Sequence, residues 1–229
     1  MTARRSPASP NRSPTITRTA ASVRVAVIGL GSGTLACQSM PGEDWKFFEI
    51  DQTMVDTARD PKYFTYIQSC QPDLEPVIGD ARLTFAREPD GVYDLIIVDA
   101  YSSDAIPIHL ATEEAMEIYK SKLAPHGAVV MHVSNRHLEL SSVVVGIADA
   151  NDMKSWVYSE DSGRDNEYIF STSVVASARD EADVGKLASS GQSSVMTKVR
   201  GPSCLTSRTG TLASWATRPA TSPAEGHST

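Results

Sequence analysis

The chain has 229 residues, 41% hydrophobic and 21% charged, which is enough for one domain with a sizeable core. No uninterrupted apolar run approaches the roughly 18 residues of a membrane-spanning helix, so we expect a soluble, cytoplasmic protein without a membrane partner. The formal net charge of -7 is concentrated in the centre of the chain, which argues against nucleic acid and is compatible with a cationic small substrate.

Residues 1–22 are rich in Ser, Thr, Pro and Arg and have no apolar periodicity. This composition predicts a disordered extension, and its prolines oppose the amphipathic helix of an organelle-targeting segment.

From Val23 onward, apolar runs of strand length alternate with helical stretches, a pattern typical of a mostly parallel α/β sheet. We expect strands at 23–29, 45–50, 74–78, 93–99 and 127–134. We expect helices at 33–40, 52–59, 81–87, 112–123 and 139–151. The helix at 112–123 has Thr112 as its N-cap and a Pro-His-Gly stop at 125–127.

Two later strand-like runs, 155–159 and 168–176, flank a polar turn and predict a terminal antiparallel hairpin. After about residue 189 the segment becomes basic and poor in large apolar residues. We therefore expect a catalytic domain at 23–188 and a disordered tail at 189–229 that does not pack.

Neither the cysteines nor the histidines form a metal motif. Cys37, Cys70 and Cys204 are odd in number and far apart, so we expect no disulfide framework and a reducing compartment. The five histidines give no pair at metal spacing with a matching carboxylate, and His132 and His137 fit a strand and a loop residue. We expect no metal.

The run VAVIGLGSGTLA places Gly29, Gly31 and Gly33 between the first strand and the first helix. Glycine there lets backbone amides approach a ligand at the positive end of the helix. GxGxG fits better than the dinucleotide motif GxGxxG, whose third glycine would fall on Thr34, and this disfavours a nicotinamide enzyme. A purely structural tight turn is the alternative.

Two carboxylates follow the next strands. Glu49 ends its strand about twenty residues after Gly29, where a carboxylate can accept both ribose hydroxyls; Asp51 is better placed as a helix cap. Asp80, in IGDAR, could accept from an adenine amino group while the backbone of Ala81 serves a ring nitrogen. The structural alternative is that Asp80 caps the helix beginning at Ala81.

In YDLIIVDAYSSDAIP, a buried strand ends in Asp99, and Asp104 follows in a serine-rich loop. Such a pair can hold a cationic amine and remove the proton that the amine must lose to become a nucleophile. Either Asp99 or Asp104 could be the base.

The ordered series GLGSGTLA, FFEID, GDAR, YDLIIVDAYSSDAIP and HVSN resembles the spermidine synthase (polyamine aminopropyltransferase) family over roughly residues 23–180. The resemblance implies a Rossmann-like class I methyltransferase fold. It also implies transfer of an aminopropyl group from decarboxylated S-adenosylmethionine to putrescine or a related amine, with no metal, and commonly a homodimer.

By the same resemblance, Glu49 would bind ribose and Asp80 the adenine. Asp99 would be the general base, and Asp104 would hold the substrate ammonium with Tyr101 as a wall.

The sequence also departs from the family. Ser32 stands where the synthases usually carry an aspartate that helps to hold the aminopropyl ammonium, and Ala100 and Tyr101 stretch the usual Asp-Ser-Ser-Asp spacing. An amino-terminal β-domain, usual in the family, is not recognised in the lead. Two alternatives therefore stay open: an S-adenosylmethionine-dependent methyltransferase with the same ligand contacts, and a truncated, non-catalytic nucleoside-binding remnant.

Overall fold

The computed structural model describes residues 22–101, 107–135, 138–160, 172–188 and 197–199. The strands of this part are β1 Arg24–Ile28, β2 Asp44–Glu49, β3 Val77–Ile78, β4 Tyr93–Val98, β5 Leu123–His132, β6 Lys154–Glu160, β7 Thr172–Ala178 and β8 Thr197–Val199. Its helices are η1 Thr34–Gln38, α1 Gln52–Arg59, α2 Tyr66–Cys70, α3 Ala81–Phe85, η2 Ile108–Leu110, α4 Glu113–Lys122, α5 Ser141–Ala150 and α6 Glu181–Ala188, where η marks a 3-10 helix.

The described strands form one eight-stranded sheet in the order β3-β2-β1-β4-β5-β7-β6-β8. Strands β1 to β5 pair in parallel, and β7, β6 and β8 continue the sheet by antiparallel pairing. The predicted α/β fold with a terminal antiparallel hairpin is therefore confirmed.

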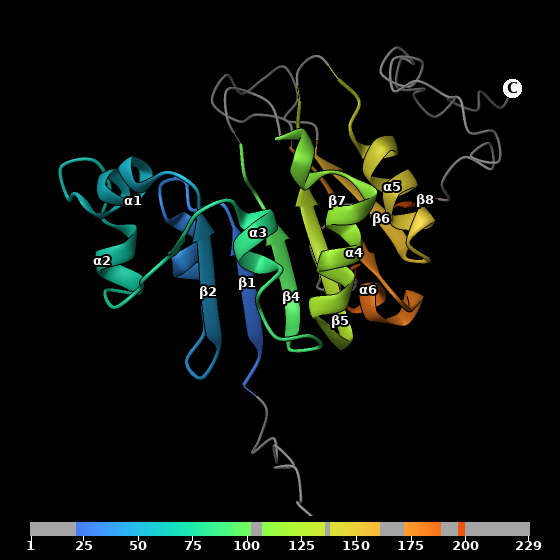
Figure 1. Cartoon of the computed structure of the whole chain (residues 1–229), viewed down its shortest axis with the longest axis horizontal. Coiled ribbons are helices and arrows are strands. Elements are labelled where there is room, and N and C mark those ends of the chain that lie inside the picture. The colour runs from blue at the N-terminus through green and yellow to red at the C-terminus, as the bar shows by residue number, and fades with distance from the viewer. Residues whose placement is uncertain (1–21, 102–106, 136–137, 161–171, 189–196, 200–229) are drawn as a thin grey trace, which may run out of the picture.

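Both faces of the sheet are covered, because neighbouring residues of β1 belong to different hydrophobic cores. Ala26 and Ile28 pack with residues of α3, α4 and α5, and Figure 1 shows α3 and α4 in front of the sheet. Val25 and Val27 pack with residues of η1, α1 and α2. A strand buried on both faces needs a continuous apolar run, which is why RVAVI has no polar alternation.

Several boundaries differ from the sequence expectation. The helix expected at 33–40 is the 3-10 helix η1, and the strand expected at 74–78 is only the two-residue β3. Helix α4 begins as predicted, with Thr112 accepting from the backbone N–H of Ala115, but it ends at Lys122, before the expected stop at 125–127. Arg179, which follows β7, lies at this end of the helix, where its guanidinium donates to the carbonyls of Lys120, Leu123 and Ala124.

Three residues of the expected tail also pack: β8 pairs with β6 through the register Ser155↔Val199 to Val157↔Thr197. Local composition did not indicate this strand, because its pairing partner lies about forty residues earlier in the chain. Helices α2 and α6 were likewise not predicted.

The cysteine expectation is wrong for one pair. Cys37 of η1 and Cys70 of α2 form a disulfide across 33 residues of sequence. Helix α2 packs against η1, so the fold brings together two cysteines that are distant in the sequence. The pairing removes the argument for a reducing compartment.

None of the helices in the described ranges is long and apolar enough to cross a bilayer.

Candidate active site

A pocket of about 530 Å³ lies at the carboxyl edge of the parallel part of the sheet, where open α/β sheets bind ligands. Four segments supply most of its wall: the glycine loop after β1, the turn from β2 to α1, residues 99–101 after β4, and the segment 107–110. Met54 and Ala81 complete it. Four of the five motifs singled out in the sequence, all except HVSN, therefore contribute to one cavity.

The glycine loop is packed directly against Asp99, the residue that follows β4. Gly29 has φ 99°, and a Cβ at this position would lie 2.4 Å from the backbone oxygen of Asp99. Gly29 and Gly31 line the pocket, whereas a Cβ on Gly33 would lie 2.7 Å from Cγ1 of Ile67 in α2. Two of the predicted glycines thus face the pocket, and the third allows close packing of α2.

The loop does not lead into the α-helix that the sequence predicts. It leads into η1, which has only five residues, so few peptide dipoles are aligned there and the expected positive helix end is weak. Any ligand at this loop would depend on individual backbone amides instead.

Glu49 ties the glycine loop to the end of β2. Its side chain is buried, with 8% of the residue exposed, and Oε2 accepts from the backbone N–H of Leu30 at 2.9 Å. Oε1 accepts from the N–H groups of Ile50 and Asp51, at 2.8 and 3.1 Å. Asp51 itself caps α1 by accepting from Thr53 N–H at 2.8 Å, and, like Glu49, it lines the pocket.

Asp80 is held as a helix cap. Its Oδ1 accepts from the backbone N–H of Arg82 at 2.9 Å and lies 3.8 Å from Nε2 of His109. Ala81 and His109 line the pocket. The structural alternative for Asp80 is therefore observed, while 37% of its side chain stays exposed beside the pocket wall.

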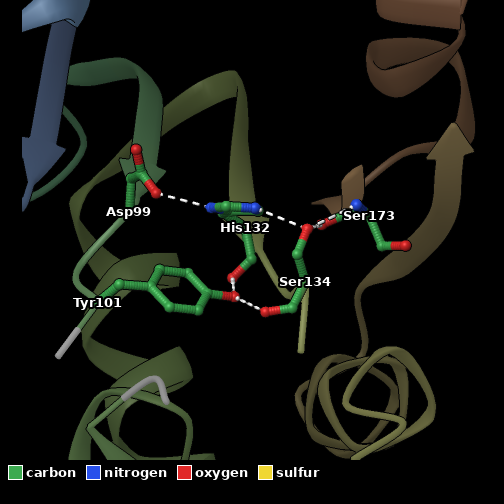
Figure 2. Close-up of polar contacts among 5 residues, drawn as sticks. All are labelled: Asp99, Tyr101, His132, Ser134 and Ser173. Carbon is green, nitrogen blue, oxygen red and sulfur yellow. Dashed lines mark hydrogen bonds and ion pairs between the residues drawn. The ribbon is translucent and has the colours of Figure 1, made fainter. Parts of the chain in front are cut away.

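Asp99 lies at the start of a hydrogen-bonded series that crosses three strands (Figure 2). Its Oδ1 is 2.8 Å from Nδ1 of His132, and Nε2 of His132 is 2.7 Å from Oγ of Ser134. Ser134 Oγ also accepts from the backbone N–H of Ser173 at 2.8 Å. Asp99 lines the pocket with 40% of its side chain exposed, and its other oxygen has no hydrogen-bond partner within the described part of the chain.

Tyr101 supports the same series from below in Figure 2. Its hydroxyl lies 2.8 Å from the carbonyl oxygen of Ser134 and 3.1 Å from that of His132, and its ring centroid is 4.6 Å from that of His132. Burial, and then the nearby charge of Asp99, raise the pKa of Tyr101 to about 12. Tyr101 therefore stays a neutral hydrogen-bond donor near pH 7.

Asp104 and His137 lie outside the described residues. The described ranges contain no group of three or more His, Cys, Asp or Glu side chains that could hold a metal ion.

Sequence reasoning missed His132, Ser134 and His109. The first two carried a usable signal: they alternate in HVSN at the carboxyl end of a parallel strand, so their side chains share one face at the edge that bears Asp99. His109 carried none, because it stands in an irregular segment between two elements.

No family model matches the chain. In sequence it is 31% identical over 112 residues to a probable polyamine aminopropyl transferase of Bifidobacterium longum, covering 47% of this chain and 23% of that protein. It is 30% identical over 112 residues to a polyamine aminopropyltransferase of Vibrio vulnificus, covering 47% of this chain and 36% of that protein. The alignments thus span less than half of each relative.

Solved structures share the fold at low identity. A probable spermidine synthase from Corynebacterium glutamicum has a TM-score of 0.57 at 17% identity, covering 77% of this chain and 67% of that one. A precorrin-6y C5,15-methyltransferase from Geobacter metallireducens has a TM-score of 0.52 at 14% identity, covering 69% and 81%. The class I methyltransferase-like fold is therefore confirmed, and so is the resemblance: over 47% of its length this chain is similar in sequence to polyamine aminopropyltransferases, and it shares the fold of a spermidine synthase.

Proposed function

We propose that this chain is a spermidine synthase-like aminopropyltransferase that uses Asp99 as its general base. One observation carries the proposal most directly: a half-exposed carboxylate, oriented through one oxygen by His132, faces a pocket walled by the glycine loop. A base must be positioned against its substrate and must keep an oxygen available to accept a proton. Asp99 meets both requirements.

The donor would lie along the wall formed by Gly29, Gly31, Glu49 and Ala81. Glu49 would accept from a ribose hydroxyl with the one lone pair, on Oε2, that its three backbone N–H contacts leave unused. The Ala81 backbone and Asp80 would recognise adenine. An adenosyl donor is supported by a fold neighbour with a TM-score of 0.51 at 18% identity, a spermidine synthase in complex with the transition state analogue AdoDATO.

The acceptor would be a small polyamine such as putrescine, bound beside Tyr101 and held by Asp99 and Asp104. Asp99 would take one proton from the ammonium, and the freed nitrogen lone pair would attack the methylene beside the donor's sulfonium. As the new C–N bond forms, the C–S bond breaks and its electron pair leaves on the sulfur of methylthioadenosine. Proton removal by a positioned base contributes roughly 10²- to 10⁴-fold in rate.

The test is a product assay with the purified full chain, decarboxylated S-adenosylmethionine and several diamines. We expect methylthioadenosine and an aminopropylated amine, and loss of both with Asp99→Asn. Light scattering of the same sample tests the homodimer that the family resemblance suggests.

A methyltransferase is the second candidate, because Ser32, not an acid, lines the pocket. In that case S-adenosylmethionine would replace the decarboxylated donor, and S-adenosylhomocysteine would be the product. Calorimetry with both donors separates the two: tighter binding of the fully carboxylated donor would contradict aminopropyl transfer. Ser32→Asp should shift the preference toward the decarboxylated donor, since it adds an anion where the aminopropyl ammonium would lie.

A further inference from the structure

We infer that His132 and Ser134 are positioning residues for Asp99, and that the antiparallel part of the sheet thereby helps to orient the proposed base. The inference rests on the proposed function only in taking Asp99 as the base; the hydrogen-bonded series itself is independent of the reaction. Neither His132 nor Ser134 is among the residues that line the pocket, so both would act through Asp99.

The contacts determine which nitrogen of His132 carries the proton. An ionised carboxylate only accepts hydrogen bonds, so the 2.8 Å contact between Asp99 Oδ1 and Nδ1 requires a proton on Nδ1. In the neutral ring Nε2 is then an acceptor, and Ser134 Oγ at 2.7 Å must donate to it. The structure thus favours the Nδ1–H tautomer.

Ser134 is itself oriented by the next strand. The backbone N–H of Ser173, in β7, donates to Ser134 Oγ at 2.8 Å, which leaves the hydroxyl proton to point elsewhere. Two acceptors are in range, Nε2 of His132 at 2.7 Å and the carbonyl oxygen of Ser173 at 3.4 Å. The shorter contact is the better hydrogen bond, so the hydroxyl donates to the ring.

Orientation of Asp99 has a direct consequence for the chemistry. The residue follows the last position of β4, and 40% of its side chain is exposed, so burial does not by itself fix the orientation of the carboxylate. Binding Oδ1 to His132 leaves the second oxygen for an ammonium in the pocket. Because a displacement of about 1 Å can cost 10²-fold in rate, the series should affect turnover more than substrate affinity.

The first part of the test does not depend on enzymatic turnover. In ¹⁵N NMR of the imidazole, at a pH where the ring is neutral, we expect His132 to be the Nδ1–H tautomer. Ser134→Ala and Asp99→Asn should each shift the population toward Nε2–H, because each removes one of the two partners that select Nδ1–H. A predominant Nε2–H tautomer in the unmodified protein would overturn the inference.

The second part separates kcat from KM. Ser134→Ala should lower kcat roughly 10-fold or more with little change in the KM of the amine, and Ser134→Thr should restore it because the hydroxyl is kept. Ser177→Ala is the matched control: it removes a buried hydroxyl pair, Ser155–Ser177 at 2.8 Å between β6 and β7, without touching His132. Equal kcat for Ser134→Ala and the control would count against positioning.

If no donor and amine pair is turned over, the proposed function fails, yet the tautomer still decides the inference about His132 and Ser134.

Discussion

The two ends of β4 carry two different carboxylate clusters. At its start, Oε1 of Glu88 binds Nζ of Lys46 at 2.8 Å, and Oε2 accepts from the hydroxyl of Tyr93 at 2.7 Å, with 15% of the Glu88 side chain exposed. At its finish, Asp99 binds His132 through one oxygen and leaves 40% of its side chain exposed to the pocket.

The difference separates a cluster whose contacts are internal from one that fits the role proposed for Asp99. Burial alone would raise the pKa of Glu88, but hydrogen bonds from Lys46 and Tyr93 hold it below its usual range. Both of its oxygens are occupied, so it is poorly suited to accept a substrate proton. Asp99 has one oxygen held and one available, which is the arrangement that acid–base chemistry requires.

The different roles of Asp99 and Glu88 can be tested by replacing each carboxylate with its amide. Asp99→Asn should lower kcat by about 10²- to 10⁴-fold, because the amide cannot accept the proton. The midpoint of thermal unfolding should change little, since the side chain is half exposed. Kinetics of methylthioadenosine release, with circular dichroism on the same samples, measures both; near-normal turnover would point to Asp104 as the base.

Gly29→Ala tests the contact between the glycine loop and Asp99. The new Cβ would lie 2.4 Å from the Asp99 oxygen, on a backbone with φ 99°, so we expect a loss of roughly 3 kcal/mol or more of unfolding free energy and a lower kcat. Gly42→Ala is the control, because its φ of 92° is similar but no atom lies within 4 Å of the added Cβ. If urea unfolding gives the same loss of free energy for both variants, the positive φ causes the destabilisation, and the contact with Asp99 does not.

The disulfide tests whether the pocket end of the sheet depends on a covalent link. Replacing Cys37 and Cys70 together by alanine should cost about 2–4 kcal/mol of unfolding free energy, because the unfolded chain loses a cross-link across 33 residues. Urea unfolding with and without a reductant measures it. A reductant should destabilise the unmodified chain only; an equal effect on the double variant would argue against the bond.

Glu88→Gln should do the reverse of Asp99→Asn: lower stability and leave kcat unchanged. We expect a loss of roughly 1–3 kcal/mol at pH 7. Because the folded pKa of Glu88 lies below its unfolded value, its contribution is present above the unfolded pKa and is lost as the pH falls through the folded one. The difference in urea midpoint between the unmodified chain and Glu88→Gln should therefore shrink below about pH 4. A difference that stays constant with pH would contradict a lowered pKa of Glu88 in the folded chain.

Tyr101→Phe should have the smallest effect, about 1 kcal/mol of unfolding free energy, since it removes one hydroxyl shared between two carbonyls. The pKa of Tyr101 is raised to about 12, so the unfolded chain releases this proton first. The contribution of the Tyr101 hydroxyl to the free energy of unfolding should be constant below about pH 10 and be lost as the pH rises toward 12. Denaturant titrations at pH 8 and pH 11 would show it, with Tyr101→Phe less sensitive to the change.

Much of the site was predictable from local pattern. Apolar runs ending in Gly29, Glu49, Asp80 and Asp99 predict parallel strands, and the carboxyl ends of parallel strands share one edge of a sheet. The individual roles of Asp51 and Asp80 were harder to predict, because both residues precede helices. For each of them the sequence left helix capping and ligand binding as alternatives. The structure shows both as caps.

By itself, the sequence determined the class of fold, the glycine loop and the acidic residues at the sheet edge, because these depend on periodicity and on the side chain that ends each strand. Only the tertiary structure decided that Cys37 meets Cys70, that Arg179 binds the carbonyls at the end of α4, and that Asp99 contacts His132, which in turn contacts Ser134. Each of these contacts joins elements far apart in the chain, where strand pairing and helix packing, not local preference, set the distances.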